Sequence, residues 1–240
     1  MQYFGMSSRG RVRDNNEDFY HVPRDAQDVP LFIAADGMGG ENGGEIASAL
    51  AVSAMAPFVK ERYAASHDLS LLLHQAVNKA NRAVFQTAQS DAQYAYMGTT
   101  LVCALFRDDL AFIANVGDSR CYLFHENELE QVSVDHSYVQ EMVDSGVLTP
   151  DQARRHPQKN LITRVVGSGR LVRTDVFCRR VREGDKLLLA TDGLTGMLTE
   201  QTIHDILSEE ADCEQTVRRL ISAAEDAGGS DNITAILVCR

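Results

Sequence analysis

Apolar and polar residues repeat with two different periods along this chain, one typical of helices and one typical of strands. Apolar side chains recur at helical spacing from Ile46 to Phe58, and a second helix is expected after Asp68, whose carboxylate suits an N-cap. Further helices are expected at 199–208 and 212–226. Short apolar runs predict strands at 2–10, 17–22, 30–36, 99–106, 109–117, 119–127, 171–179, 185–190 and 232–240.

Two of these runs, residues 99–106 and 109–117, are apolar at nearly every position, so strands formed by them need cover on both faces. The turn between them is too short for the crossover that parallel strands require, which favours an antiparallel sheet. An antiparallel sheet between a second sheet and a layer of helices satisfies both observations. We therefore expect an α+β fold.

No internal repeat, low-complexity tract or linker divides the chain, so a single domain over residues 1–240 is the economical interpretation. Residues 137–165 are polar and helical in pattern, and Pro150 and Pro157 divide them into short pieces. We interpret this segment as a surface insertion in the domain. The strands at 171–179 and 185–190 are expected to follow it as a pair.

Four aspartates lie where an apolar strand meets a turn: Asp36, Asp118, Asp192 and Asp231. Because strand ends lie at the rim of a sheet, these side chains can converge on one site. Carboxylate oxygens are ligands suited to Mg²⁺ or Mn²⁺. Each aspartate taken alone can equally be a turn former or a helix cap. Their shared context, an apolar strand and small neighbouring residues, favours a metal site.

The glycine-rich stretch GMGGENGG comes directly after Asp36 and leads into the first helix. A phosphate cradle for a nucleotide is one alternative, but no GK[ST] follows and no GxGxxG is in register. Asp36 would also repel a bare phosphate unless a cation lay between them. We interpret the stretch as a tight connection, because glycine adopts positive φ without penalty.

Charge and cysteine usage narrow the class of protein. Acidic residues outnumber basic ones by 34 to 23, which gives a net charge of −11 and disfavours nucleic acid as a partner. The five cysteines are scattered without a CxxC pair, and no HxH or HxxxH pair is present, which argues against a disulfide framework and a zinc site. With no secretory signal and no run long enough to span a bilayer, we expect a cytoplasmic protein.

Arg13, in the turn-rich segment GRVRDNNED, is a candidate for binding an anionic substrate. A guanidinium can grip two phosphate oxygens at once, which the negative surface of the protein would otherwise repel. A solvated loop arginine is the alternative. Glu17 and Asp18, taken alone, can be exposed charges.

Eight segments occur in an order that resembles the bacterial metal-dependent serine/threonine protein phosphatases, the PPM or type 2C family. The segments are VRDNNEDFY, AADGMGGENGGEIAS, MGTTLV, ANVGDSRCYLF, DHSYVQEMVDSGVLTP, NLITRVVG, LLLATDGLTGML and GGSDNIT. The similarity runs over essentially the whole chain. It implies a four-layer α-β-β-α sandwich with two central antiparallel sheets, and residues 137–165 as a mobile flap near the active site.

The resemblance also implies a role for each acidic residue that matches the family motifs. Asp36 would bridge two metals, and Gly37 would bind one of them through its carbonyl. Asp192 and Asp231 would complete the shell of the first metal. Asp118 would be the ligand of a third metal, shared with Asp192.

Outside these direct ligands, Glu17 and Asp18 would hold metal-bound waters, and Arg13 matches the phosphate-binding arginine of the family. Met38 is a departure from the eukaryotic members, which carry a proton-donating histidine there. Bacterial members commonly have methionine at this position, so activity is still expected. A water on the third metal is our first candidate for the general acid.

The function implied by the resemblance is hydrolysis of phosphoserine and phosphothreonine by a metal-bridging hydroxide, with two or three Mn²⁺ or Mg²⁺ ions per chain. The expected partners are phosphorylated proteins and a cognate bacterial Ser/Thr kinase whose action the enzyme counteracts. We expect a monomer, with no nucleic acid partner and no membrane span. The alternatives are a non-catalytic phosphoprotein-binding or regulatory module of the same fold, and a phosphatase for small esters or phosphotyrosine.

Overall fold

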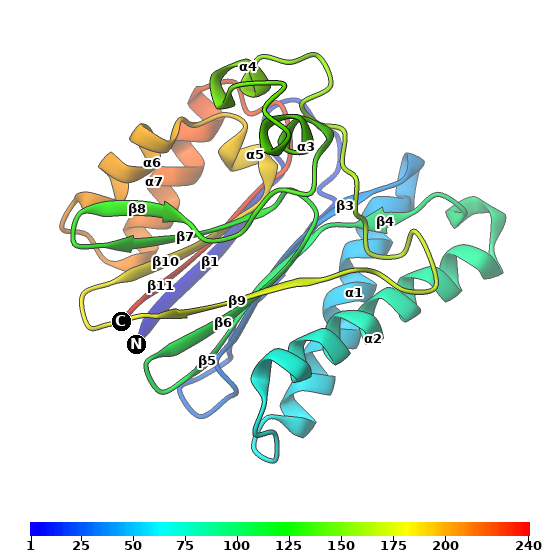
Figure 1. Ribbon diagram of the computed structural model, residues 1–240, viewed down its shortest axis with the longest axis horizontal. Helices are drawn as coiled ribbons and strands as arrows, with labels where there is room; N and C mark the ends of the chain where they lie inside the picture. The colour runs from blue at the N-terminus through cyan, green and yellow to red at the C-terminus, as the bar shows by residue number, and fades with distance from the viewer.

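The computed structural model describes residues 1–240, apart from the side chains of residues 40–42. Two antiparallel sheets pack face to face, and helices cover the outer face of each sheet (Figure 1). The result is a four-layer α-β-β-α sandwich. The expected α+β class and the expected order of layers are therefore confirmed.

The first sheet has five strands in the order β1-β11-β10-β7-β8. Their bounds are β1 Gln2–Ser8, β7 Arg120–His125, β8 Glu128–Gln131, β10 Lys186–Ala190 and β11 Ile233–Cys239. Three helices pack on its outer face: α5 Asp192–Thr195, α6 Glu200–Ser208 and α7 Cys213–Asp226. The first and last strands of the chain are neighbours, with Gln2 opposite Cys239.

The second sheet has six strands, of which five follow the order β2-β3-β5-β6-β9 and β4 pairs with the end of β3. Their bounds are β2 Asp18–His21, β3 Leu31–Met38, β4 Gly98–Thr99, β5 Leu101–Arg107, β6 Leu110–Val116 and β9 Asp175–Arg180. Its outer face is covered by two long helices, α1 Gly40–Arg62 and α2 Leu69–Ser90, and a short 3₁₀ helix, η1 Ala92–Tyr94, follows them. As expected, Asp68 caps α2, where its carboxylate accepts a hydrogen bond from the Leu71 N–H.

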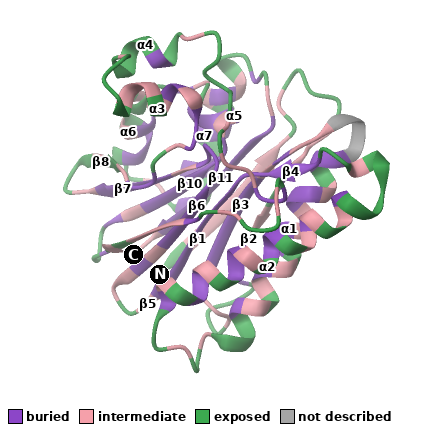
Figure 2. Cartoon of the chain, turned by 45° about the vertical axis from the view of Figure 1, so that its right-hand side comes forward, coloured by how far each residue is buried: buried purple, intermediate pink, exposed green. Residues whose placement is uncertain are grey.

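The core explains why the central strands are apolar on both faces. Along β5, Leu101, Cys103 and Leu105 face the helices, whereas the alternate residues Val102 and Ala104 face the other sheet. The pleat of a strand sends successive side chains to opposite faces, so both sets are buried here. Figure 2 shows this burial concentrated in the strands, while the outer faces of the helices stay exposed.

Several expected boundaries differ from the structure. The strands β9 and β10 do not pair, because β9 lies beside β6 and β10 lies between β7 and β11. The glycine-rich stretch is only partly a connection, since α1 begins at Gly40 and the side chains of residues 40–42 lie outside the described set. β3 continues to Met38, where Gly37 and Met38 pair with β4.

Cys213 at the start of α7 and Cys239 at the end of β11 form a disulfide. The prediction against disulfides was wrong at this pair, because cysteines 26 residues apart give no local signal of their meeting in space. Cys103 and Cys121 are free and fully buried, and Cys178 is free and exposed.

Residues 137–165 carry two short helices, α3 Tyr138–Asp144 and α4 Pro150–Arg154. In Figure 1 both helices lie beyond one end of the two sheets, the end at which β10 runs into α5. None of the described helices combines the length and the apolar composition needed to span a membrane.

Candidate metal and phosphate site

Five aspartates that are distant in sequence meet at this end of the sandwich. Asp18 and Asp36 are cross-strand partners on β2 and β3 of the six-stranded sheet. The strands β10 and β11 of the five-stranded sheet bring in the next two aspartates. Asp192 follows the end of β10 after one residue, Thr191, and Asp231 lies two residues before the start of β11. Asp118 lies in the turn by which the chain passes from β6 to β7, and so from one sheet to the other.

The electrostatics of these side chains reflect their closeness to one another. Burial raises the pKa of Asp36 well above its ordinary value, and repulsion by Asp18, Asp192 and Asp118 raises it further. Burial also raises the pKa of Asp192, with repulsion by Asp231 as the next cause. A carboxylate cluster of this kind holds protons, or cations, more readily than isolated aspartates do.

Two of the aspartates are almost completely withdrawn from water. Asp18 and Asp118 are each only 7% exposed. Burial raises the pKa of Asp18 to about 7, although hydrogen bonds from Thr234 and Thr191 lower it. Burial raises the pKa of Asp118 to about 8, with repulsion by Asp192 as the next cause.

Hydroxyl groups at neighbouring strand ends orient Asp18. Its Oδ2 accepts hydrogen bonds from Thr191 Oγ1 at 2.9 Å and from Thr234 Oγ1 at 2.6 Å. Thr191 Oγ1 in turn accepts the Thr234 N–H, so β10 and β11 hold one oxygen of Asp18 together. The other oxygen, Oδ1, is buried without a hydrogen-bond partner.

Asp36 is held through its backbone by Thr99, the last residue of β4, and by Thr100, which links β4 to β5. Its N–H donates to Thr100 Oγ1 at 3.0 Å, and its carbonyl accepts from Thr99 Oγ1 at 2.8 Å. Thr100 Oγ1 also contacts Ser119 Oγ at 2.7 Å, next to Asp118. The positions of Asp36 and Asp118 are therefore tied by one buried hydroxyl pair.

Asn232 fastens the loop that carries Arg13 and Glu17 to the start of β11. Its Oδ1 accepts the Glu17 N–H at 2.8 Å, and its Nδ2 donates to the carbonyls of Arg9 and Asn15 at 3.0 and 2.8 Å. One side chain thus closes three hydrogen bonds with a loop more than 200 residues away in sequence. This amide fixes where Arg13 can reach.

Arg13 lies beside the aspartates. Its Nη2 donates to Asp231 Oδ2 at 2.8 Å, while the side chain is 49% exposed. The hydrogen bond to Asp231 raises the pKa of Arg13, and the charges of Glu17 and Asp36 act in the same direction. The guanidinium is therefore tethered at one nitrogen and open to solvent at the rest of its fork.

Two glycines let backbones approach one another inside the site. A Cβ at Gly37 would lie 2.0 Å from the Gly44 carbonyl oxygen, and a Cβ at Gly193 would lie 1.9 Å from that of Asn232. Both distances are far inside van der Waals contact. Glycine is required at both positions by close packing rather than by an unusual φ, which argues against a purely turn-forming role for these Asp-Gly pairs.

The donor set fits a hard divalent cation. Oδ1 atoms of Asp18, Asp118 and Asp192 are all buried without a hydrogen-bond partner, which is a costly arrangement for a carboxylate unless a cation approaches it. Among the side chains that the structure describes, no group of three or more His, Cys, Asp or Glu residues is placed to hold a metal ion by itself. Water and backbone carbonyls would have to complete the shell of such a cation, as is usual for Mg²⁺.

The structure brings the predicted residues together at one end, with Glu17 and Arg13 on a loop beside the five aspartates. Sequence reasoning missed the supporting residues, although they lie inside the segments that carry the family resemblance: Thr99, Thr100, Thr191, Asn232 and Thr234. Short polar residues at strand ends are common, so nothing in their type or spacing distinguishes them before the strands are paired.

The fold and this site define a class of protein in which two packed sheets gather carboxylates for divalent cations at one end. Comparison with known sequences makes the assignment specific. The sequence profile described as Protein phosphatase 2C matches residues 7–238, and the chain belongs to this family.

Individual relatives and solved structures are similar to nearly the whole of this chain. The serine/threonine phosphatase stp of Listeria welshimeri is 37% identical over 98% of this chain and 94% of its own. The crystal structure of the Mycobacterium tuberculosis serine/threonine phosphatase PstP/Ppp matches with a TM-score of 0.90 and 36% identity, over 98% of this chain and 97% of that one. A second structure, the PstP catalytic domain in complex with 2 manganese ions, matches with a TM-score of 0.87 and 35% identity, over 98% and 96% of the two chains.

Proposed function

We propose that this protein removes phosphate from phosphoserine and phosphothreonine in other proteins, with the help of divalent cations. The observation that carries the proposal is the set of aspartates drawn from both sheets, three of which have a buried oxygen without a partner. The names of the similar proteins, serine/threonine phosphatases, support the choice of substrate.

The cations are Mn²⁺ or Mg²⁺ in this proposal, and the structural neighbour in complex with 2 manganese ions supports the metal type. Asp36, the Gly37 carbonyl, Asp192 and Asp231 would hold two cations, and Asp118 would hold a third together with Asp192. Glu17 and Asp18 would act on them through water. When bound, the cations would activate water for attack on phosphorus and neutralise charge on the phosphate oxygens.

Arg13 would bind the phosphate group. Its guanidinium already lies beside the aspartates and keeps free donors that face solvent. A phosphate oxygen can accept from those donors without breaking the bond to Asp231, because a guanidinium has five N–H groups. Met38 has no proton to donate to the leaving oxygen, so no side chain is assigned that step.

The direct test is turnover of a phosphothreonine peptide by the full chain. Dialysis against a chelator should abolish the activity, and Mn²⁺ or Mg²⁺ should restore it. Asp192→Asn should lose at least about tenfold in kcat/KM, whereas Asp205→Asn, on the exposed face of α6, should be unaffected. Turnover that survives chelation would overturn the proposal.

The same assay separates the alternatives. A non-catalytic module would bind phosphopeptides without releasing phosphate at any cation concentration. A phosphatase for small esters or for phosphotyrosine would prefer those compounds over phosphoserine and phosphothreonine peptides.

The proposal includes phosphorylated proteins and a cognate Ser/Thr kinase as partners and a single domain acting as a monomer. It places residues 137–165 as a flap beside the site. The proposal includes a cytoplasmic location, which the substrate class supports because ATP, the phosphate donor for such kinases, is a cytoplasmic metabolite. Size-exclusion chromatography with light scattering tests the oligomeric state.

A further inference from the structure

His136 is a buried histidine that the proposed function does not use. It is 4% exposed and lies directly before the 137–165 segment. Burial is the main cause that lowers its pKa, which favours the neutral ring. Its surroundings indicate what a neutral imidazole does there.

Both ends of the His136 ring are engaged. Nδ1 accepts the Gly117 N–H at 3.1 Å, so this nitrogen carries no proton. The proton of a neutral ring must then be on Nε2, which lies 3.1 Å from Asp175 Oδ2 and donates to it. Arg164 Nη1 also lies 3.0 Å from Nε2. A guanidinium nitrogen is only a donor and cannot accept the Nε2 proton, so Nη1 donates to Asp175 Oδ1, at 2.9 Å.

Through this ring and its own backbone, His136 holds both polar groups of the Gly117 peptide. The His136 N–H donates to the Gly117 carbonyl at 2.9 Å, which also accepts from Asn115 Nδ2 at 3.2 Å. Gly117 has a φ of 105°, and a Cβ there would lie 2.6 Å from Thr100 Cγ2. The turn is therefore clamped on one side by His136 and on the other by Thr100, and the next residue is Asp118.

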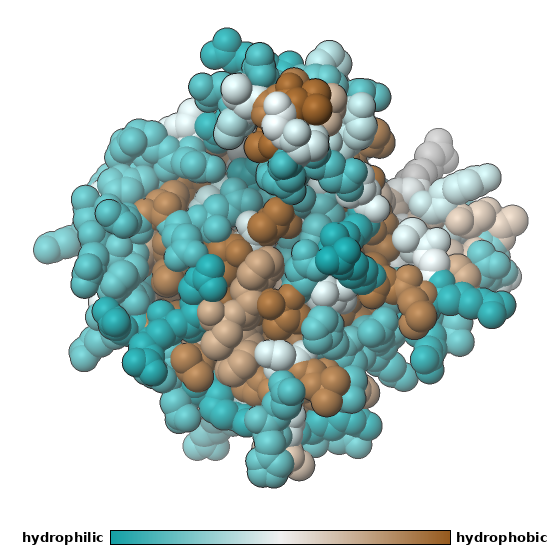
Figure 3. All heavy atoms as spheres, viewed as in Figure 1, coloured by the Kyte–Doolittle hydropathy of each residue, from teal (hydrophilic) through white to brown (hydrophobic). Residues whose placement is uncertain are grey.

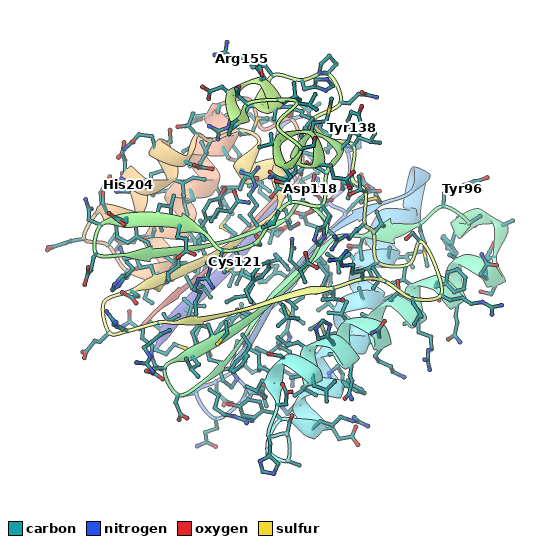
Figure 4. The ribbon with its side chains drawn as sticks, in the orientation of Figure 1. Tyr96, Asp118, Cys121, Tyr138, Arg155 and His204 are labelled. Atoms are coloured by element: carbon teal, nitrogen blue, oxygen red, sulfur yellow. A yellow bond between two sulfur atoms is a disulfide. The ribbon has the colours of Figure 1, made fainter. Side chains whose placement is uncertain are left out.

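His136 also stands where the 137–165 segment leaves and rejoins the body of the protein. Its carbonyl accepts the Thr163 N–H at 2.8 Å, and Ser137 and Ile162 form a β-bridge. In the view of Figure 4, Asp118 lies below Tyr138, the first residue of α3. A cavity of about 490 Å³, lined by Glu141 and His136 among others, opens beside the network, so the segment is not packed tightly there.

We propose that His136, oriented by Asp175, is a positioning residue that holds the Gly117–Asp118 turn in place for the third cation and couples that turn to the 137–165 segment. The inference rests on the proposed function, because it takes Asp118 to be a cation ligand. Residues that orient a ligand from outside the coordination shell typically change metal affinity by 10- to 100-fold when they are altered.

The experiment is a Mn²⁺ titration of the full chain without substrate, with free Mn²⁺ followed by electron paramagnetic resonance. His136→Asn leaves a carbonyl oxygen near the position of Nδ1 and can still accept the Gly117 N–H. His136→Gln places its amide near Nε2 and reaches Asp175 instead. We expect Asn to keep the affinity of the weakest site within about threefold and Gln to weaken it by at least about tenfold.

Two further variants complete the design. Asp175→Ala should weaken the same site, because it removes the acceptor that fixes the ring, and the stronger sites should not change. Arg173→Ala is the control, since the Arg173 side chain is 78% exposed and its Nε comes no closer than 3.8 Å to Asp175 Oδ1. The concentration of Mn²⁺ that gives half-maximal turnover should follow the same order as the binding constants.

The outcomes separate this inference from its premise. If Asp118→Asn leaves all Mn²⁺ sites intact, the role of Asp118 fails and the inference fails with it. If Asp118→Asn removes the weak site but His136→Gln keeps it, or if Asn and Gln weaken it equally, only the positioning role is overturned. Circular dichroism of each variant verifies the fold. Both His136→Asn and His136→Gln keep a polar side chain in the buried site, so a difference between them does not come from a loss of polarity.

Discussion

Arg13 and Asp231 form an ion pair in which the arginine is half exposed, so the pair itself contributes little to stability. The role of the pair is instead to fix the position of the Arg13 guanidinium. The tether to Asp231 points the guanidinium toward the acidic cluster, and the Asn232 clamp limits how far its loop can move. A phosphate that reaches the site meets a donor group that is already oriented, which lowers the entropic cost of binding.

Replacing Arg13 by alanine should therefore raise KM for a phosphothreonine peptide by about 10-fold or more and change kcat less, because it removes ground-state binding. Lysine should recover only part of the loss, since it cannot make the forked contact. Steady-state kinetics with saturating Mn²⁺ are the measurement. Arg11→Ala is the matched control, because Arg11 lies in the same loop as Arg13 but pairs with the exposed Asp226 at the end of α7. A defect confined to kcat would contradict a binding role.

Single elements position the site through close packing. The short helix α5 starts at Asp192, and its second residue, Gly193, lies against the Asn232 carbonyl. A side chain there would push α5 away from the start of β11 and would separate Asp192 from Asp231. The same reasoning applies to Gly37, which lies against Gly44 and the Glu17 carbonyl.

Gly193→Ala should accordingly lower the free energy of unfolding by about 2 kcal/mol or more and weaken Mn²⁺ binding, because overpacking forces the backbone to shift. Gly169→Ala is a suitable control, since a Cβ there would meet its nearest atom at an ordinary 3.6 Å. Urea denaturation and calorimetric Mn²⁺ titration measure the two effects. Equal stability of the two variants would show that the close contact at Gly193 can relax.

The strands β5, β10 and β11 are the most distinctive in the sequence, because both of their faces are covered and their apolar runs are therefore continuous. The strand β8 was missed, since its sequence ELEQ lies at a sheet edge and is mostly polar. The helix α5 was missed because a single turn has no periodicity to detect. The candidate aspartates could be chosen because they follow apolar strands, but the Asn232 clamp depends on contacts more than 200 residues apart and has no local signal.

For the molecule as a whole, the aspartate cluster is a source of instability when no cation is present. The pKa of Asp118 is about 8 in the folded protein, against an ordinary value of about 4 for aspartate. Between these values the folded state holds a proton that the unfolded state releases. The stability contributed by this group is therefore complete below about pH 4 and is lost as the pH rises toward about 8.

In the presence of a chelator, the melting temperature of the wild type should therefore fall relative to that of Asp118→Asn as the pH is raised from 5 to 8. The variant keeps a neutral side chain at every pH, and a difference of 1 kcal/mol corresponds to about 2–4 °C for a chain of this size. Saturating Mn²⁺ should reverse the order, because only the wild type has the full set of carboxylates. A constant difference between the two melting temperatures across this pH range would show that Asp118 ionises normally.

The disulfide between Cys213 and Cys239 acts on the unfolded chain. Closing a loop between residues 26 apart should add about 3.5 kcal/mol of stability in the chain-entropy description. A reducing agent should lower the melting temperature of the wild type and leave Cys213→Ser unchanged. Turnover measured below the melting temperature should be equal in both redox states, because Cys239 is at the opposite end of β11 from Asp231. A loss of turnover on reduction would place the bond in contact with the site.

The surface that Figure 3 shows is mostly hydrophilic, with hydrophobic residues in the middle of the view and in a smaller group at the top. Asp36 lies on β3 of the six-stranded sheet, and Asp192 follows β10 of the five-stranded sheet. A cation bound by both carboxylates would hold the two sheets together at this end of the sandwich. Metal binding would then slow amide hydrogen exchange at the ends of β3 and β10 together. Occupancy of the site could therefore be measured from the local opening of the two sheets, without any substrate.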